Sequence, residues 1–465
     1  MTGSDGRPRP GTPALSDRRP RPGTPAENNV LDYVAVGAGP FDLGLAALAE
    51  PAGLRGVVLE SRDDVGWHAG MMLPDATLQV PFMADLVTMA DPTSPYSVLA
   101  FLKDVGRLYP FYIRESFYPL RAEYDRYLRW AADRLPVRLG HHVESVTRED
   151  GPDGPVHVVR ARTTSGRVTF RARHLVLGVG TRPHVPDAVR GLDGPGGPLL
   201  HTADYLDRKA ALQATDSITV VGSGQSAAEV YRDLLEDARD LGYHLTWVTR
   251  SPRFFPMEYT KLTLEMTSPE YTAYFQGLPP EVRDRLVGEH KPLYKGISAD
   301  LVDDVYDTLY RLGASGPVPT DLHAGTSLVD AAWDAAAGRY VLDLHHDETD
   351  RGFRTSTASL VLATGYRAEL PALVEPLRDV LRWDDRGRYD VAADYSVDDA
   401  HRVFVQNAEE HTHGFVAPDL GMGAFRSSVV VNAMCGREVY PVEQRIAFQT
   451  FGAPSDDRDL VRGGA

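Results

Sequence analysis

The sequence is poor in cysteine, in long apolar runs and in positive charge. Cys435 is the only cysteine in 465 residues, which excludes an intramolecular disulfide and a metal site built from cysteines. No apolar run approaches the roughly 20 residues that span a bilayer, and no N-terminal hydrophobic segment predicts a secretory signal. The 49 Lys and Arg against 65 Asp and Glu give a net charge of −16. This charge argues against binding to nucleic acid or an anionic membrane, and we expect a cytoplasmic protein.

The length and composition are those of a globular protein with two or three domains. Hydrophobic residues make up 43% of the chain and charged residues 25%, which is ordinary for soluble domains. Residues 1–30 are an exception, because they contain RPRPGTPA twice, at residues 7–14 and 19–26. Proline, glycine and arginine without apolar residues cannot form a core. We predict a disordered tail at residues 1–30 and a flexible tail at 453–465.

The first motif, VAVGAGPFDLG at residues 34–44, has the pattern of a strand, a glycine turn and a helix. This is the start of a dinucleotide-binding βαβ unit. Gly37 allows the tight turn, and Gly39 lets the backbone approach a diphosphate at the helix N-terminus. Asp42 occupies the third glycine position, so the strict motif is broken. Glu60 lies 23 residues after Gly37, where an acid that binds ribose is expected.

A second motif of the same kind, SITVVGSGQSAAE, lies at residues 217–229. Gly222 and Gly224 form the turn, 185 residues after the first copy. The next predicted strand, residues 244–248, leads to Arg250, a cation where the first unit has an acid. A cation there suits a 2′-phosphate and favours NADP over NAD. Two glycine turns without ligands are the alternative, but the matched context favours a flavoprotein that uses FAD and NADPH.

The remaining patterns place further helices and strands. Residues 121–135 predict an amphipathic helix with Tyr124, Leu128, Ala131 and Leu135 on one stripe. Residues 258–312 predict a helical insertion, with prolines at its turns. Apolar, β-branched runs predict a meander at residues 143–146, 156–161 and 168–170. A buried strand that ends in glycine is predicted at residues 174–180. Later strands are predicted at residues 340–344, 359–362 and 403–405.

Five segments resemble one known family. They are GAGPFDLGLA at residues 37–46, the block at 107–132, VVGSGQSAAE at 220–229, LATGY at 362–366 and NAEEHTHG at 407–414. In order and spacing over residues 31–445, they resemble the flavin-dependent N-hydroxylating monooxygenases, the lysine/ornithine N-monooxygenase group of hydroxamate siderophore biosynthesis. Disulfide reductases share the glycine motifs, but they need a CxxxxC pair that this chain lacks.

The resemblance implies an α/β, two-dinucleotide-binding-domain fold. A Rossmann-like FAD-binding domain would occupy residues 31–208, and residues 336–452 would complete it with the substrate-binding region. A Rossmann-like NADPH-binding domain, residues 209–335, would be inserted between these parts. The implied chemistry is reduction of FAD by NADPH, formation of a C4a-hydroperoxyflavin with O₂, and hydroxylation of a neutral primary amine. The expected partners are the amine, O₂ and further copies of the chain, as a dimer or tetramer.

The resemblance also implies site residues. Gln79 lies where the family places a glutamine near flavin and nicotinamide, and it is the catalytic candidate; the alternative is a turn-capping amide. Besides the motif glycines, Glu60 and Arg250, the implied cofactor contacts are Pro40, Trp67, His68, Gln79, Gln225, Ser226, Thr364, Gly365, Tyr366 and His413. Trp67 and His68 could instead be core residues. His411 and His413 lack the spacing of a helical zinc site, so we predict no metal.

The substrate is predicted from a departure within the family pattern. Amino-acid hydroxylases of the family read Ser-Phe-Leu-Lys-Asp-Leu before the flavin, and their lysine is understood to pair with the substrate carboxylate. Residues 81–86 here read Pro-Phe-Met-Ala-Asp-Leu, which places Ala84 at the lysine position. A buried carboxylate without its cation is costly. The pattern, which resembles the diamine-hydroxylating branch, therefore favours cadaverine and then putrescine.

Alternatives to the diamine assignment follow from the same residues. Lys103 or Arg107 could supply the missing cation, and the substrate would then be lysine or ornithine. A flavoprotein that only oxidises NADPH and releases peroxide is a third possibility. The second ammonium of a diamine needs an acceptor, and we expect Glu258 or Asp85 to hold it. The alternative for either residue is a solvated or structural carboxylate.

Overall fold

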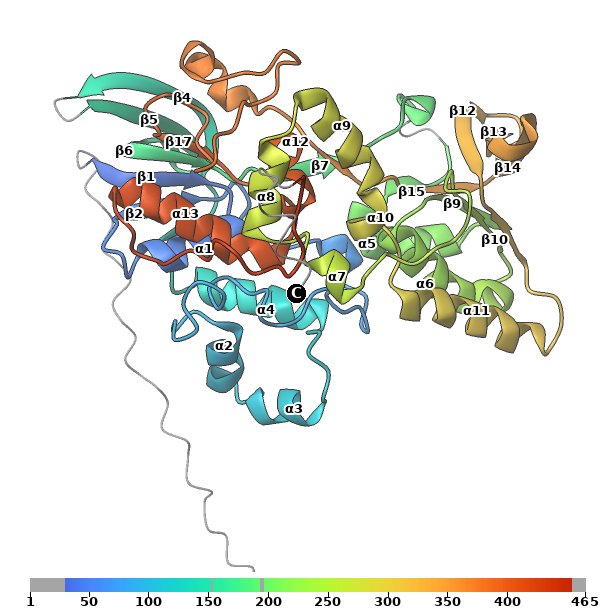
Figure 1. The fold of residues 1–465 in the computed structure, drawn as a ribbon. Coiled ribbons are helices and arrows are strands. Elements are labelled where there is room, and N and C mark those ends of the chain that lie inside the picture. The colour runs from blue at the N-terminus through green and yellow to red at the C-terminus, as the bar shows by residue number, and fades with distance from the viewer. Residues whose placement is uncertain (1–29, 152–153, 193–195, 454–465) are drawn as a thin grey trace, which may run out of the picture.

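The structure, a computed structural model, describes residues 30–151, 154–192 and 196–453. Two β-sheets lie in separate halves of the molecule, with a group of short helices between them (Figure 1). The predicted tails, residues 1–30 and 453–465, fall outside the described residues apart from residues 30 and 453. In the described part of the chain, no helix is both long and apolar enough to cross a bilayer.

The first sheet grows from the N-terminal motif. Its order is β3-β2-β1-β6-β5-β4, and β17 pairs with the end of β6. The strands are β1 Leu31–Val36, β2 Gly56–Leu59, β3 Val137–Arg138, β4 His142–Gly151, β5 Gly154–Thr163, β6 Gly166–Leu177 and β17 Val403–Val405. Strands β3, β2, β1, β6 and β17 pair in parallel. Their carboxyl ends therefore share one edge, where open α/β sheets bind ligands.

The predicted meander is present as β4, β5 and β6. The separate strand predicted at residues 174–180 is instead the second half of β6, so that boundary is wrong. Ala172 pairs with His157 on the antiparallel side and with Leu31 on the parallel side. One strand thus passes from the meander into the parallel sheet without a break.

Five helices accompany this sheet: α1 Pro40–Ala49, α2 Val98–Asp104, α3 Leu108–Ile113, α4 Arg121–Ala132 and α13 Gly423–Cys435. Helices α1 and α13 lie side by side against one face of the sheet (Figure 1). The amphipathic helix predicted at residues 121–135 is confirmed as α4, and all four residues of its stripe are buried. The helix ends three residues early, at Ala132.

The second sheet is parallel throughout and has the order β11-β10-β9-β15-β8. Its strands are β8 Leu199–His201, β9 Ser217–Gly222, β10 His244–Val248, β11 Thr320–His323 and β15 Ser359–Ala363. The helices α5 Tyr205–Gln213, α6 Gln225–Leu241 and α11 Ala299–Gly313 accompany it. An antiparallel sheet of β12 Thr326–Asp334, β13 Arg339–His346 and β14 Arg351–Thr357 precedes β15, and β7 Thr181–Pro183 pairs with β16 Tyr366–Ala368.

The second sheet extends beyond the range predicted for its domain. Strands β8 and β15 lie outside residues 209–335, yet both belong to this sheet. The reason is that β15 returns beside β9, with Ala363 opposite Gly222. In each half, a meander leads into a parallel strand that lies beside the glycine motif: β6 in the first half and β15 in the second. Local periodicity does not reveal which sheet such a strand joins.

The helical insertion is confirmed as α7 Lys261–Leu264, α8 Pro269–Gln276, α9 Pro280–Glu289 and α10 Lys291–Tyr294. It packs on α12 Glu410–His413 of the C-terminal third, where Phe275, Tyr271 and Phe415 form a small apolar core. It therefore lies between the two halves. The connections contain the 3₁₀ helices η1 Ala69–Met71, η2 Asp187–Val189, η3 Thr202–Asp204, η4 Asp347–Thr349, η5 Ala372–Val380, η6 Gly414–Val416 and η7 Leu420–Met422.

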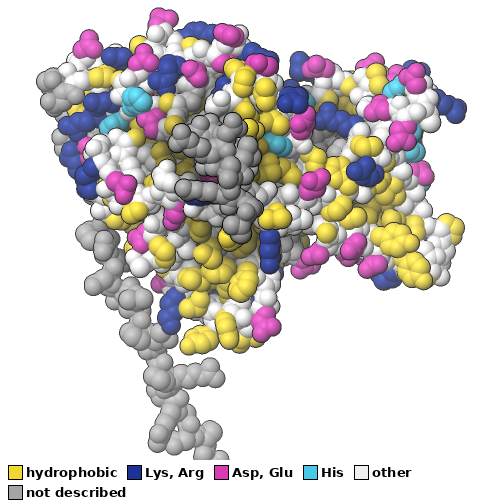
Figure 2. All heavy atoms as spheres, in the orientation of Figure 1, with side chains coloured by type: hydrophobic (Ala, Val, Ile, Leu, Met, Phe, Trp, Pro, Cys, Tyr) yellow, Lys and Arg dark blue, Asp and Glu magenta, His cyan; other side chains and the backbone are white. Residues whose placement is uncertain are grey.

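Large apolar side chains gather on the face that carries α3 (Figure 2). Tyr109, Tyr112, Ile113 and Phe117 are all exposed there. Exposed apolar patches often mark contacts with other molecules. The patch is consistent with the predicted homo-oligomer, which stays a prediction.

A buried ion pair joins the two halves. Arg121 at the start of α4 donates to both carboxylate oxygens of Glu229 in α6, at 2.8 and 3.0 Å. The two side chains are only 11% and 7% exposed. Arg121 also donates to the carbonyl oxygen of Met71. The pair therefore fixes the first half against the second nucleotide-binding unit.

Removal of one partner should destabilise the protein, because the other charge is left buried and unpaired. We expect Glu229→Gln and Arg121→Met each to lower the free energy of unfolding by about 3 kcal/mol, measured by urea unfolding. The double variant R121M/E229Q should lose less than the sum of the two single variants, because no unpaired buried charge remains. As a control, Asp343→Asn breaks the ion pair to Arg354, whose side chains are 39% and 69% exposed, and should cost less than about 1 kcal/mol. An equally small loss in E229Q would mean that the buried pair contributes no more than an exposed one.

Candidate functional site

The first glycine turn connects β1 to α1 at the carboxyl edge of the sheet. Gly37 has φ +111°, and a Cβ there would lie 2.3 Å from the carbonyl oxygen of Gly178, so only glycine fits. Gly39 caps α1 without any side-chain hydrogen bond, and Pro40 is the first helical residue. An added Cβ at Gly39 would meet nothing within 4 Å. The backbone at Gly39 therefore borders open space at the N-terminus of α1, as a diphosphate site requires.

Glu60 lies at the end of β2, beside this turn. Its carboxylate accepts hydrogen bonds from the backbone amides of Ala38 and Arg62, both at 3.0 Å. Burial opposes ionisation, but the Arg62 and Ala38 hydrogen bonds outweigh it and lower the pKa of Glu60. Glu60 is therefore an ionised acceptor next to the glycine turn, where a ribose hydroxyl would be bound.

The second glycine turn repeats the geometry between β9 and α6. A Cβ on Gly222 would lie 2.3 Å from the carbonyl oxygen of Ala363 in β15. Gly224 caps α6, again without a side-chain hydrogen bond, and Ser226 is in the first turn. Arg250 is exposed directly after β10. The buried Thr249 before it donates to Ser223 in the glycine turn, at 2.6 Å, which places the chain of Arg250 beside that turn.

Gln79 and Gln225 meet across the two halves. The Nε2 of Gln79 donates to the Oε1 of Gln225 at 3.0 Å. The same Oε1 accepts from the amide of Ser298, and the Nε2 of Gln225 donates to Glu229. The amide of Gln225 is thus held by three protein groups. Sequence patterns indicated both glutamines but not their contact, because the residues are 146 positions apart.

A row of aromatic rings lines the junction between the halves. Trp67 contacts His68 with ring centroids 4.8 Å apart, and the ring of Tyr366 lies between His68 and His201, at 5.5 and 5.1 Å. Desolvation of the His68 ring, followed by the charge of Arg121, lowers the pKa of His68 to about 4. His68 is therefore neutral at pH 7. His201 was missed, because a single histidine before a turn carries no motif.

The LATGY segment is tied to the connection that follows β7. The Oγ1 of Thr364 donates to the carbonyl oxygen of His184, and the amide of His184 donates to the carbonyl oxygen of Gly365. That oxygen also accepts from His201. Gly365 has φ +79°, which favours glycine. The Thr364 hydroxyl therefore holds this loop, and the Tyr366 ring is the part that faces the junction.

The three predicted substrate residues have different surroundings. Ala84 is buried in a turn, with its amide donating to the carbonyl oxygen of Pro81. The Asp85 carboxylate accepts from the amides of Val87, Thr88 and Val98 and from the Thr88 hydroxyl, at 2.6–2.9 Å. These local donors occupy both oxygens, so Asp85 organises its own loop. Glu258 is exposed, in a segment paired with residues 292–297, and is left as the acidic candidate.

The ring of His413 has a stacking partner, and each of its nitrogens has a polar partner. Its ring stacks on Tyr395 with centroids 4.5 Å apart, Nε2 lies 2.7 Å from the Nε2 of Gln276, and Nδ1 lies 2.9 Å from the Oγ1 of Thr412. Burial, followed by the charge of Arg426, lowers the pKa of His413. The geometry therefore makes it a joint between α8 and the C-terminal third and leaves neither ring nitrogen for a cofactor. In the described part of the chain, no three His, Cys, Asp or Glu side chains are grouped to hold a metal.

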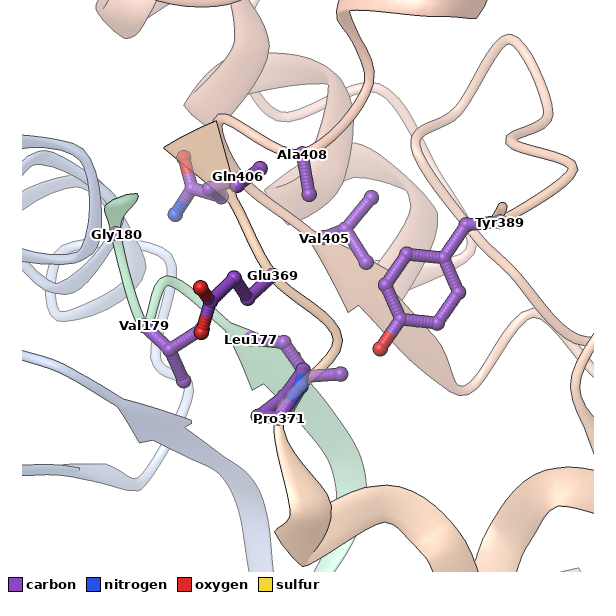
Figure 3. Close-up of a pocket in the computed structure, with 10 residues that line it drawn as sticks. Leu177, Val179, Gly180, Glu369, Pro371, Tyr389, Val405, Gln406 and Ala408 are labelled. Atoms are coloured by element: carbon purple, nitrogen blue, oxygen red, sulfur yellow. The ribbon is translucent and has the colours of Figure 1, made fainter. Parts of the chain in front are cut away.

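A small pocket lies where β6 and β17 end. Figure 3 shows Val405 at the end of β17 and Gln406 just after it on one side, Val179 after β6 on the other, and Glu369 between Gln406 and Val179. Gln406 is fully buried and bonds to Asp42 of α1. No sequence pattern pointed to Gln406.

These residues fit two dinucleotide cofactors. Two helices begin at glycines that offer no side-chain cap, and an ionised acid and an arginine lie beside the respective turns. The FAD-type turn would use Gly37, Gly39, Pro40 and Glu60. The NADPH-type turn would use Gly222, Gly224, Ser226 and Arg250.

Comparison with known proteins agrees with this geometry. The chain is 44% identical to a putrescine N-hydroxylase of Shewanella oneidensis over 439 residues, which covers 94% of this chain and 87% of that protein. The crystal structure of the FAD-bound cadaverine monooxygenase of the desferrioxamine pathway of Erwinia amylovora matches with a TM-score of 0.89 and 49% identity, over 92% of this chain and 100% of that chain. An ornithine N-hydroxylase of Kutzneria sp. 744, solved with reduced FAD, NADP⁺ and L-ornithine, matches with a TM-score of 0.79 and 26% identity, over 88% and 99%.

These neighbours confirm the predicted two-dinucleotide-binding-domain flavoprotein fold. Residues 29–368 match the family described as L-lysine 6-monooxygenase/L-ornithine 5-monooxygenase. The chain therefore belongs to this family of flavin-dependent N-monooxygenases, as its five sequence segments predicted.

Proposed function

We propose that this protein hydroxylates one primary amine of an aliphatic diamine, cadaverine first and putrescine second, in hydroxamate siderophore biosynthesis. The balanced reaction is diamine + O₂ + NADPH + H⁺ → N-hydroxydiamine + H₂O + NADP⁺. The observation that carries the proposal is the similarity to relatives named for diamines, at 44% and 49% identity. Two of the relatives named for ornithine are 26% and 34% identical.

The loop that contains Ala84 supports a substrate without a carboxylate. Ala84 is buried and brings no charge. Of the two alternative cations, Arg107 is paired with Glu123 at 2.5 Å, and Lys103 is exposed on α2. A carboxylate in this region would thus lie without a cation of its own, which is costly in a partly buried site.

The chain's own groups hold and orient the cofactors and the substrate. Gly37, Gly39, Pro40 and Glu60 would hold FAD; Gly222, Gly224, Ser226 and Arg250 would hold NADPH, with Arg250 on the 2′-phosphate. When bound, the reduced flavin supplies the oxygen chemistry with O₂. Gln79 is the residue we place at the meeting point of flavin and nicotinamide, where its bond to Gln225 fixes its amide. The rings of Trp67, His68 and Tyr366 border this junction.

The reacting nitrogen must lose its proton before it can accept oxygen. A free aliphatic amine has a pKa of about 10.4, and burial lowers it because a desolvated ammonium is disfavoured. The second ammonium must stay charged, and the exposed carboxylate of Glu258 is suited to hold it. The two ends of one substrate would therefore occupy a dry and a solvated environment.

The function is tested by a hydroxylamine assay with FAD and NADPH, in which cadaverine, putrescine, lysine and ornithine are offered side by side. We expect hydroxylated cadaverine in a ratio of one to the NADPH consumed, less product from putrescine, and little from either amino acid. Product from lysine or ornithine above that from the diamines would overturn the substrate assignment but not the chemistry. NADPH consumption with only peroxide from every amine would show an oxidase.

Ala84→Lys should move the preference toward amino acids, because the new ammonium can pair with a substrate carboxylate. We expect the ratio of kcat/KM for lysine to that for cadaverine to rise about tenfold, which corresponds to about 1.4 kcal/mol. Met83→Lys is the matched control, since Met83 is the neighbouring residue and is exposed. An equal change in both variants would mean that position 84 does not face the substrate.

Glu258→Gln should weaken binding of the second ammonium, because the amide keeps the shape and loses the charge. We expect KM for cadaverine to rise about tenfold with a small change in kcat, since a charge-assisted hydrogen bond is lost. Glu281→Gln, an exposed residue in α9 of the same insertion, is the control. An unchanged KM in E258Q would remove Glu258 from the site.

A further inference from the structure

Asp42 occupies the third position of the first glycine motif, and the proposed function gives it no role. Its side chain is 1% exposed. A Cβ built on Gly178, just after β6, would lie 2.3 Å from its Oδ2. The glycine at 178 therefore leaves the room that the Asp42 carboxyl group fills. Asp42 is therefore buried. It does not cap α1 either, because the cap position of that helix receives no side-chain hydrogen bond.

The partner of Asp42 is an amide with a matching shape. The Nε2 of Gln406 donates to the Oδ1 of Asp42 at 2.7 Å. The remaining oxygens of the two side chains, Asp42 Oδ2 and Gln406 Oε1, are both buried and have no hydrogen-bond partner among the described residues. Two acceptors cannot satisfy each other. If Oδ2 carries a proton, it becomes a donor, and the amide oxygen of Gln406 is an acceptor that has no other partner among the described residues.

The charges around Asp42 do not compensate an anion. Arg426 of α13 is the cation that faces it, but its Nη1 lies 3.1 Å from Glu409 Oε1, and these two side chains are 1% and 0% exposed. The charge of Arg426 is thus balanced by Glu409. Glu60 after β2 adds a further negative charge near Asp42.

Burial decides the protonation state. The first turn of a helix favours an anion, but this effect is smaller than the cost of taking an unpaired carboxylate out of water. Burial and the charge of Glu60 raise the pKa of Asp42 well above its ordinary value, against the opposing effects of Gln406, Arg426 and the Gly178 backbone. The geometry and the electrostatics therefore agree.

We propose that Asp42 is a positioning residue held as the neutral acid, joined to Gln406 by two hydrogen bonds, so that it adds no negative charge beside the diphosphate of FAD. The role toward FAD rests on the proposed function. The α1 N-terminus attracts the diphosphate through its amides and dipole, and an ionised carboxylate in the same turn would oppose this attraction. The pair also ties the first turn of α1 to the end of β17, so the turn keeps its place relative to the sheet edge.

The proton itself can be observed by infrared spectroscopy of the full-length protein as purified, without turnover. We expect the difference spectrum between wild type and Asp42→Asn at pH 7 to contain the C=O band of a protonated carboxylic acid. Gln406→Leu should shift that band, because the acid loses its amide partner. Loss of a carboxylate band in D42N, in place of the acid band, would overturn the proposal. The variant D42N keeps the shape and can still bond to Gln406, so it is expected to fold.

A titration of apoprotein with FAD gives an independent readout. Since Asp42 is already neutral in the proposal, D42N should bind FAD within about twofold of wild type at pH 7. If wild-type Asp42 were ionised, D42N would remove a negative charge and tighten FAD binding about tenfold, the equivalent of one pKa unit, and the proposal would fail. If neither protein binds FAD while the acid band is present, the proposed function fails and the neutral acid stands.

The pH dependence has a definite sign. A raised pKa means that the folded chain holds the proton more tightly than the unfolded chain, so the stability from this proton is complete at low pH and is lost as pH rises through the folded pKa. Wild type should therefore lose more unfolding free energy than D42N between pH 6 and pH 9. Parallel pH profiles for the two proteins, together with a carboxylate band, would show an ordinary ionised aspartate.

Discussion

The close approach of backbone to backbone at two glycine turns is the constraint on which the architecture depends. Gly37 lies against the carbonyl of Gly178, and Gly222 lies against the carbonyl of Ala363. The first contact brings the end of β6 up to the N-terminus of α1, and the second brings the end of β15 up to the N-terminus of α6. Each helix then begins at a glycine, without a side-chain hydrogen bond at its cap. One packing solution thus creates both the sheet order and the two anion-binding ends.

The two halves must also hold their cofactors in register, and polar contacts do this. The buried Arg121–Glu229 pair and the Gln79–Gln225 bond cross the junction in neighbouring positions, since Gln225 also bonds to Glu229. The helical insertion is fixed to the C-terminal third through Gln276 and His413. Buried polar bonds are directional and costly to break. These bonds therefore fix the orientation of the two halves relative to each other. The site is composed of segments from both halves, and no single local motif contains them all.

Local patterns predicted the glycine turns, the α4 stripe and the helical insertion, because each depends on residues close together in the chain. They did not predict the sheet of β15, since a short apolar strand carries no mark of its neighbour. They also did not predict the partners of His413 and Asp85. The resemblance placed His413 near the cofactor, and Asp85 was one of two acids expected to hold the second ammonium. Gln276, 137 residues away, contacts the histidine, and backbone amides of its own loop bond to the aspartate. Availability of a polar group depends on partners, which tertiary structure alone supplies.

Substrate selection in the proposed function depends on the absence of a cation at Ala84 that could pair with a substrate carboxylate. The oxygen-accepting amine must be neutral, and the distal amine must stay an ammonium, so the two ends of a diamine require opposite environments. An amino acid adds a carboxylate, which needs a further cation near Ala84. Arg107 is already paired with Glu123, and the acidic chain, with its net charge of −16, offers the distal ammonium a favourable approach. The separation between the dry end and Glu258 would then set the preferred chain length, which makes cadaverine and putrescine distinguishable by the same pocket.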